Sequence, residues 1–570
     1  MYTHYIRTSE KGLSDTKVSD RPGEGSANAL FQYGGAGVGR LAEADFSVPL
    51  GGGLVCFGGP SLAKQRGCRI GIDVETIHDL LPSLCFSVHT LYHKQYIFAI
   101  EGRQCFVICY NQSNMEEKNT KMEDIVSLAK RRGFVYPGSD IYGGEAGLYD
   151  FGPNGVELLN NIKKSWWKAN IYDRDDFVGI DSAIFKHPKV WEASGHVGGF
   201  SDPLAECKVC HTRIRVDKEL GAIGVTADEK MSEDELNKLF DENRDKIKCP
   251  KCGNKDFSDV KPFNLLVKSN LGDFTGENER PVYLPGEACQ GIYLNFRNVV
   301  DTMPVKIPFG IAQIGKAFRN EISPRNFLFR TRELEQADTQ YFVKPHENKE
   351  VFERIKNDRW QWYLSLGINE ENLRWKQHEN LVFYASDAWD IEYNYPSLGF
   401  DEVEGVHDRT DYDLTQHMKF SGVDLRYNDP MTNEKYIPWI LETSMGMGRI
   451  FLAVLSDAYT VEKMKNGDMR TVLKLNPELA PVKYAVSPLL KNKPELVEKA
   501  RQVYQMLKKK YGNVMWDDNG NIGKRYRRQD EIGTPYCVVI DFETLEDDMV
   551  TVRDRDTTEQ KRVTIADLAK

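Results

Sequence analysis

A group of charged residues between positions 310 and 343 is the strongest sign of chemistry in the chain. Four arginines and three glutamates alternate there with apolar residues, which predict two strands around a polar turn. Charges on a solvated edge strand would explain the pattern without a ligand, because they discourage pairing with other chains. Arginines on a buried sheet instead predict an anion site, since guanidinium groups bind phosphate and carboxylate oxygens in pairs. The residues are Arg319, Glu321, Arg325, Arg330, Arg332, Glu333 and Glu335.

Two pairs of cysteines have the spacing of zinc ligands. One Cys-x-x-Cys unit stands at 207–210 and a second at 249–252. Each unit can offer two thiolates to a tetrahedral zinc ion, with bonds of about 2.3 Å. Four thiolates leave no position for water, so this zinc would be structural. The alternative is four reduced thiols without metal. The candidate ligands are Cys207, Cys210, Cys249 and Cys252.

Composition restricts the class of protein. A chain of 570 residues is expected to form roughly two to four domains. It has the hydrophobic and charged content of a soluble protein, and no apolar run reaches the ~18 residues of a membrane-spanning helix. The net charge of −10 argues against nonspecific binding of nucleic acid, but it allows a local basic groove. The beginning of the chain shows no apolar signal segment, so we expect a cytoplasmic protein.

The elements that position these residues are expected to begin near residue 115. Residues 1–114 carry no assignable motif, apart from a possible hairpin at 95–110, so we expect a dispensable extension before a functional start at Met115 or Met122. Thr120 and Glu123 have the spacing of a helix capping box, which Ser232 and Glu235 repeat before a polar helix expected to end at Lys248. The tail alternates strands and helices, which predicts a small α/β domain. We expect its helix at 494–511 and its strands at 484–490, 514–516 and 537–540.

Two segments resemble signature motifs of the class II aminoacyl-tRNA synthetases. Arg319, Asn320 and Glu321, followed by residues 329–338, are similar to motif 2 of that family. Residues 441–459 are similar to motif 3, in which a strand and a glycine-rich turn precede an arginine at the head of an apolar helix.

Longer strings narrow the resemblance to the glycyl-tRNA synthetases of the homodimeric kind. The segment WEASGHVGGFSDP at 191–203 and the segment at 133–167 are both similar to that family. Residues 283–295 resemble a strand of the family, although its arginine is missing here. The helix at 156–167 and the segment with Pro188 would correspond to motif 1, which implies a dimer interface.

The resemblance implies both a fold and a function. The fold is an α+β class II catalytic domain on an antiparallel sheet at 115–475, with a zinc-ribbon-like insertion at about 205–260 and a C-terminal α/β anticodon-binding domain at 476–570. The function is activation of glycine with ATP to glycyl-adenylate and transfer to tRNA(Gly), without a membrane. Two alternatives stay open: a noncatalytic accessory or tRNA-binding subunit, and a synthetase for another amino acid.

The resemblance also assigns roles to residues. Arg319, Glu321 and Arg449 are expected to be catalytic, and Glu402 is expected to hold Mg²⁺ with ATP. ATP is expected at Arg319, Asn320, Glu321, Phe329, Arg330, Thr331, Arg332, Glu333, Leu334, Glu402, Val403, Gly446, Met447, Gly448 and Arg449. Glycine is expected at Arg215, Glu287, Leu334, Glu335, Gln336, Ala337, Asp338, Arg409, Glu442, Thr443, Ser444, Met445 and Gly446.

Two positions depart from the family pattern. Leu334 stands where the family usually has phenylalanine, and it loses an aromatic contribution to adenine binding of roughly 0.5–1.5 kcal/mol. Asp338 stands where the family usually has glutamate and is one methylene shorter. Both departures predict weaker substrate binding without loss of activity.

Overall fold

A computed structural model describes residues 120–227, 231–272, 280–322, 324–379, 381, 385–464 and 467–568, and the backbone of six short strands before them. The chain divides into two compact units, 1–119 and 120–570. In the first unit β1 (Ala27–Asn28) pairs with β2 (Asp45–Phe46), β3 (Val55–Phe57) with β4 (Arg69–Gly71), and β5 (Tyr96–Glu101) with β6 (Gln104–Cys109). The last pair confirms the predicted hairpin. The rest of the predicted extension lies outside the described residues.

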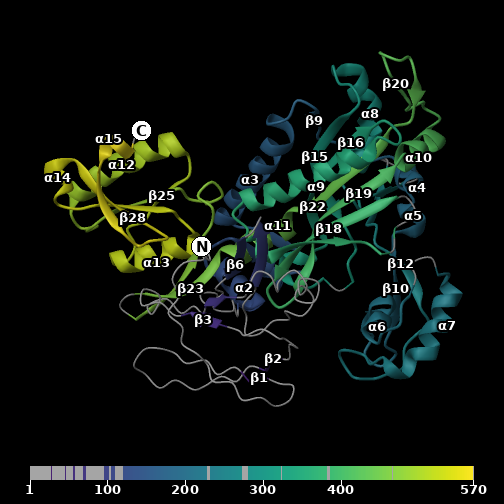
Figure 1. The fold of residues 1–570 in the computed structure, drawn as a ribbon, viewed down its shortest axis with the longest axis horizontal. Helices are drawn as coiled ribbons and strands as arrows, with labels where there is room; N and C mark the ends of the chain where they lie inside the picture. The colour runs from purple at the N-terminus through teal and green to yellow at the C-terminus, as the bar shows by residue number, and fades with distance from the viewer. Residues whose placement is uncertain are drawn as a thin grey trace. The chain divides into compact units, whose positions relative to one another are not determined.

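A seven-stranded sheet forms the centre of the second unit, and it is drawn mainly in green and teal in Figure 1. Every neighbouring pair is antiparallel except β9 and β15, which confirms the predicted antiparallel sheet. The strand order is β17 (Leu373–Gln377), β18 (Asp387–Tyr395), β19 (Gly399–Thr410), β22 (Trp439–Gly446), β16 (Glu333–Val343), β15 (Phe309–Phe318) and β9 (Phe177–Gly179).

Helices cover both faces of this sheet. On one face, α2 (Met122–Arg131), α3 (Pro153–Trp167), α9 (Asn348–Ser365) and α11 (Met447–Ala458) bury a large apolar core that includes Trp166 and Phe451. On the other face, α8 (Gln290–Thr302) and α10 (Tyr412–Ser421) bury a smaller core around the packed rings of Phe296, Phe309 and Phe342. This smaller core covers only part of that sheet face, and polar side chains of β16 and β22 lie on the rest.

The cysteine pairs belong to an insertion with its own small core. Its sheet has the order β11 (Arg213–Arg215), β10 (Ser201–Glu206), β12 (Lys261–Asn264), and α6 (Val216–Ala222) and α7 (Glu233–Asn243) pack on it. The predicted capping box at Ser232 and Glu235 is confirmed. The α-helix ends before the predicted Lys248, because a short 3-10 turn, η4 (Arg244–Lys246), follows it.

The C-terminal domain, coloured yellow in Figure 1, has a five-stranded mixed sheet. The strand order is β26 (Val514–Trp516), β25 (Tyr484–Pro488), β27 (Tyr536–Ile540), β28 (Met549–Asp554) and β29 (Gln560–Thr564). The predicted helix is α12 (Pro494–Tyr511), and α13 (Ile522–Ile532) follows β26. The α/β tail is therefore confirmed. Its Asp530 pairs with Arg470 of the hairpin β23 (Tyr459–Lys463) and β24 (Met469–Leu473) at 3.2 Å.

Shorter elements complete the described part. They are β7 (Val135–Pro137), η2 (Asp140–Tyr142), β8 (Tyr149–Phe151), η3 (Lys168–Tyr172), α4 (Pro188–Ala193), α5 (His196–Gly199), β13 (Lys268–Leu271), β14 (Arg280–Tyr283), η5 (Phe327–Phe329), η6 (Glu370–Asn372), β20 (Tyr427–Asn428), β21 (Lys435–Tyr436), α14 (Thr544–Asp547) and α15 (Ile565–Leu568). Among the described helices, none combines the length and apolar character needed to cross a membrane.

Candidate active site

The register of β16 and β22 decides which predicted residues share a face. Asp338 lies opposite Ser444, and Gln340 lies opposite Glu442. Successive side chains of a strand point to opposite faces, so only alternate residues can line one site. On the face covered by α8 the two strands present Gln336, Asp338, Gln340, Glu442 and Ser444.

The residues between them point to the other face. Glu335 pairs with Lys163 of α3 at 2.6 Å, and the hydroxyls of Thr339 and Thr443 lie 2.9 Å apart. Ala337 and Met445 are fully buried in the larger core. Of the consecutive runs predicted to contact glycine, the side chains of Glu335, Ala337, Thr443 and Met445 therefore do not reach the polar face.

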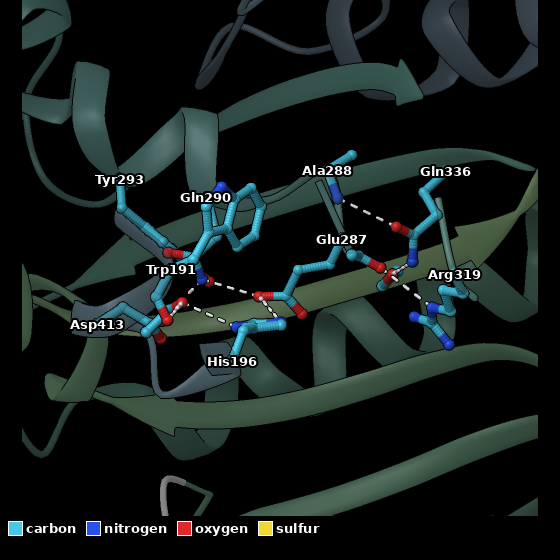
Figure 2. Close-up of polar contacts among 12 residues, drawn as sticks. Trp191, His196, Glu287, Ala288, Gln290, Tyr293, Arg319, Gln336 and Asp413 are labelled. Carbon is cyan, nitrogen blue, oxygen red and sulfur yellow. Dashed lines mark hydrogen bonds and ion pairs between the residues drawn. The ribbon is translucent and has the colours of Figure 1, made fainter. Parts of the chain in front are cut away.

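A network of charged and amide groups begins at Glu287. Its Oε1 accepts a hydrogen bond from Gln290 Nε2 at 2.8 Å, and the same amide lies 3.4 Å from Asp413 (Figure 2). Burial alone would raise the pKa of Glu287, but His196 and then Arg409 hold that pKa well below its usual range. Glu287 is therefore a carboxylate anion at neutral pH.

Arg409 forms the cationic centre of the network. It pairs with Asp413 at 2.8 Å and with Glu442 at 3.0 Å, and all three side chains are buried. Glu442 also contacts His407 at 3.1 Å and accepts from Gln340 at 2.8 Å. Burial opposes ionisation of Glu442, yet Arg409 and then His407 lower its pKa to about 2.

Asp338 is the exception in this network. Its side chain is 0% exposed, and neither carboxylate oxygen has a hydrogen-bond partner of normal geometry. Burial, followed by the charge of Glu442, raises the pKa of Asp338 well above its usual range, although the Ser444 hydroxyl on the opposite strand acts in the other direction. Buried carboxylates are normally paired, so an unpaired one beside two anions indicates a place for a cation.

The motif 2 loop brings its charges to the edge of this network. Arg319 follows β15 and donates from Nε to the Gly286 carbonyl at 3.1 Å. Glu321 is 4% exposed, pairs with Arg330 at 3.0 Å and accepts from Arg332 through its carbonyl. The backbone N–H of Asn320 donates to the Leu265 carbonyl. The Thr331 hydroxyl donates to the carbonyl of Glu333. Glu333 is exposed and Leu334 is half-buried.

Arg449 stands in the first turn of α11, as predicted. Its guanidinium lies 4.4 Å from the ring centre of Phe329 and pairs with Glu402 at 3.0 Å. A β-bulge in β19 explains why Glu402 reaches it. Ile391 pairs with Glu404 and Glu392 with Glu402, so Val403 has no partner and the strand is bent there.

Glycines bring the motif 3 turn close to the motif 2 loop. A side chain at Gly448 would place its Cβ 3.0 Å from the Leu328 carbonyl. Gly446 ends β22 as the N-cap of α11, and Met447 is buried behind it. The two predicted ATP segments therefore do meet.

The structure does not bring Arg215 into the network around Glu287 and Glu442. Arg215 ends β11 of the insertion and pairs with Asp202 at 3.0 Å and with Asp217 at 2.5 Å. Burial opposes the charge of Arg215, but the hydrogen bond to Asp217 and the charge of Asp202 raise its pKa, with a smaller contribution from Glu321 of motif 2.

Several residues of the site were missed by sequence reasoning. Asp413 was detectable, since it lies four residues after Arg409 at the start of a helix. His196, His407 and Gln340 carry no local signal for their contacts. His407 also lies near His378 and Asp390, with ligand atoms within 4.8 Å of one another. Hydrogen bonds of 2.8 Å from His378 to Asp390 and 3.1 Å from His407 to Glu442 account for this group without a metal.

The four predicted zinc ligands do converge. The Sγ atoms of Cys207 and Cys252 lie 3.6 Å apart, and those of Cys210 and Cys249 lie 3.5 Å apart. Bonds of about 2.3 Å in a tetrahedron require separations of ~3.8 Å, so the group fits zinc with little movement.

Comparisons with known proteins agree with this geometry. Residues 273–458 match the family described as "tRNA synthetase class II core domain (G, H, P, S and T)", and residues 483–570 match "Anticodon binding domain". A prolyl-tRNA synthetase of Giardia lamblia in complex with prolyl-adenylate has the same fold, with a TM-score of 0.52 and 14% identity over 79% of this chain and 75% of that one.

Relatives of high identity were also found. The chain is 51% identical to a glycine–tRNA ligase of Clostridium acetobutylicum, over 80% of this chain and 98% of that protein. It is equally similar to glycine–tRNA ligases of Clostridium tetani (79% and 97% covered) and Acetivibrio thermocellus (80% and 98% covered).

Proposed function

Because the chain belongs to the glycine–tRNA ligase family, we propose that its polar sheet face binds glycine beside ATP and joins the amino acid to tRNA(Gly). The protein is an ATP-dependent class II ligase with a catalytic core and an anticodon-binding domain. The observation that carries the proposal for the site is the buried carboxyl of Asp338, which has no hydrogen-bond partner of normal geometry and on which the charges of Glu442 and Glu287 act.

Glycine recognition follows from the charges. An ammonium group next to Asp338 would supply the cation that this buried carboxylate lacks, and Glu287 would lie on its other side. Arg409 is the cation of the network and suits the glycine carboxylate. Selection of glycine needs only a close wall, because every competing amino acid is larger. A site that must instead reject a smaller rival gains only about 1–3 kcal/mol per methylene.

Activation needs alignment more than acid–base chemistry. The glycine carboxylate is itself the nucleophile, so no side chain has to remove a proton. The arginines Arg319 and Arg449 would hold the phosphates of ATP and stabilise the charge that develops on their oxygens. Phe329 and Leu334 would cover the adenine, and Glu321 would keep Arg330 and Arg332 in place. Each phosphate-binding arginine should contribute on the order of 3 kcal/mol to the transition state.

Two metals fit the residues present. Glu402 is a carboxylate beside Arg449 and would hold Mg²⁺ with ATP, and its partial exposure of 46% leaves it accessible. Bound Mg²⁺ would neutralise part of the negative charge on the ATP phosphates. The four cysteines of the insertion would hold a structural Zn²⁺.

The C-terminal domain would bind tRNA through α13. A cavity of about 700 Å³ is lined there by Arg132, Lys524, Arg527, Arg528 and Arg553, among others. Nη1 of Arg527 is buried without a hydrogen-bond partner in the described structure, which suits a phosphate or base oxygen. Sequence-specific recognition of RNA usually reads unstacked bases in such sites.

We also propose a cytoplasmic homodimer. Ile141 and Tyr142 in η2 and Tyr172 in η3 are 89, 87 and 75% exposed, and a second copy of the chain would cover such apolar side chains. The molar mass in solution tests this assembly. A monomer of 65.2 kDa at micromolar concentration would exclude it.

Charging of tRNA tests the proposed function. The purified chain should attach labelled glycine to tRNA(Gly) in the presence of ATP and Mg²⁺, and the Arg319→Ala variant should not. Binding of tRNA without charging would instead support the noncatalytic accessory subunit. The presence of Arg319, Glu321 and Arg449 favours the enzyme.

A further inference from the structure

We propose that His196 is a positioning residue for glycine, which holds Glu287 so that one of its oxygens faces the substrate ammonium group. This inference rests on the proposed glycine site. His196 lies in the string WEASGHVGGFSDP, for which the proposed chemistry gives no role. Its imidazole is close to the reaction site without being expected to touch ATP or tRNA.

The imidazole of His196 is held rigidly. It is 9% exposed and lies between the rings of Trp191 and Phe200, with centroid distances of 5.3 and 5.0 Å. Its Nδ1 lies 2.8 Å from the Ser194 hydroxyl, which fixes the rotation of the ring. The left-handed φ of 82° at Gly195 turns the chain into this position, and glycine tolerates that conformation without strain.

The other ring nitrogen points to Glu287. Nε2 of His196 lies 3.5 Å from Oε1, and Gln290 donates to the same oxygen at 2.8 Å (Figure 2). A carboxylate can only accept, so Nε2 is the ring nitrogen whose proton this contact favours. Among the described residues both contacts are made to Oε1, which leaves Oε2 for a ligand. The hydrogen bond from Gln290 and the nearby imidazole nitrogen both lie on the side of Oε1, so the other oxygen points away from them.

A purely structural role is not needed to explain the loop. Asn264 donates from Nδ2 to the backbone carbonyls of His196 and Val197, at 3.0 Å each. These contacts do not involve the imidazole, so the loop keeps its anchor when the side chain is replaced. The imidazole instead lowers the pKa of Glu287 and lies 3.5 Å from its Oε1.

Two amide variants distinguish a role of Nε2, which faces Glu287, from a role of Nδ1, which faces Ser194. In His196→Gln the amide nitrogen can replace Nε2 and donate to Glu287. In His196→Asn the shorter amide can replace only Nδ1, toward Ser194. His211→Gln, at an exposed position of the insertion, is the matched control. Glycine-dependent exchange of pyrophosphate into ATP gives kcat and the two KM values, and calorimetry gives the affinity for glycine independently of turnover.

The inference predicts a split between the variants. His196→Asn should raise the glycine KM about tenfold or more, with kcat and the ATP KM within about threefold of wild type. A factor of ten corresponds to 1.4 kcal/mol, which is near the top of the ~0.5–1.5 kcal/mol of an ordinary polar contact. His196→Gln should stay within about threefold, like His211→Gln.

Three results would decide against the inference or against its premise. Equal glycine KM values for wild type and both His196 variants would overturn it. A fall in melting temperature with equal losses for glycine and ATP would show a structural role and overturn it as well. If wild type shows neither exchange nor calorimetric binding of glycine, the proposed function fails, and the inference that depends on it is overturned too.

Discussion

Replacement of Asp338 by asparagine should make the protein more stable and abolish its use of glycine. The carboxylate is fully buried, unpaired and close to Glu442 and Glu287. Leaving a buried polar group without a partner costs about 1–3 kcal/mol, and more for a charged one. Asparagine has nearly the same shape without the charge, so the free energy of unfolding near pH 7 should rise by at least ~1 kcal/mol. Glycine activation should fall because the substrate ammonium loses its anion.

The pH dependence of this effect has a definite sign. The pKa of Asp338 in the folded protein is raised, whereas the unfolded chain has the usual value near 3.8. Below that pH the carboxyl is protonated in both the folded and the unfolded protein, so its ionisation does not change the free energy of unfolding. As the pH rises toward the folded pKa, the unfolded state loses its proton first, and the folded state loses stability relative to it. The gain from Asp338→Asn should therefore vanish near pH 4 and grow toward neutral pH.

Thermal melts of wild type and variants between pH 4 and 8 measure this directly. Asp530→Asn is the matched control, because Asp530 is also 0% exposed but is paired with Arg470 and Arg553. Loss of one partner of a buried ion pair typically costs 3–5 kcal/mol, so this variant should melt lower. A lower melting temperature for Asp338→Asn at pH 7, or retained glycine activation, would rule out an unpaired, substrate-binding carboxyl at this position.

Three further predictions concern ATP and zinc. Arg449→Ala should lower kcat/KM for pyrophosphate exchange by a factor on the order of 10² or more, as for the loss of one charge-stabilising donor, and an unchanged rate would remove Arg449 from the phosphate site. Leu334→Phe should lower the ATP KM by about two- to tenfold, the equivalent of 0.5–1.5 kcal/mol, and a raised KM would show that adenine does not lie there. Elemental analysis should find one zinc per chain, which Cys207→Ser with Cys252→Ser removes; full metal content in that variant would contradict the cysteine site.

Local patterns predicted the secondary structure around both motifs. β15, β16, β22 and α11 fall where alternating and helical apolar patterns placed them. The predicted capping box at Ser232 is confirmed. The one predicted at Thr120 is wrong, because the N-cap is Lys121, whose backbone N–H donates to the Asp124 carboxylate. Both segments have the residue spacing of a capping box, but the first helix begins at Met122, two residues after Thr120, whereas the second begins directly after Ser232.

Contacts between distant segments were beyond sequence reasoning. The register between β16 and β22 decides that Asp338 faces the site while Glu335 faces Lys163, and no local pattern specifies it. The bulge at Val403 turns Glu402 toward Arg449 for the same reason. The contact between His196 and Glu287 joins residues from separate elements, so it became visible only in the folded chain.

Exchange of pyrophosphate into ATP in the presence of different amino acids shows whether the chain activates glycine. The purified chain is mixed with ATP, Mg²⁺ and labelled pyrophosphate, and glycine, alanine and serine are added separately. We expect exchange with glycine alone, because Asp338, Glu287 and Arg409 would bind the amino acid in a site proposed to exclude larger side chains. No exchange from the folded protein, or equal exchange with alanine, would contradict it.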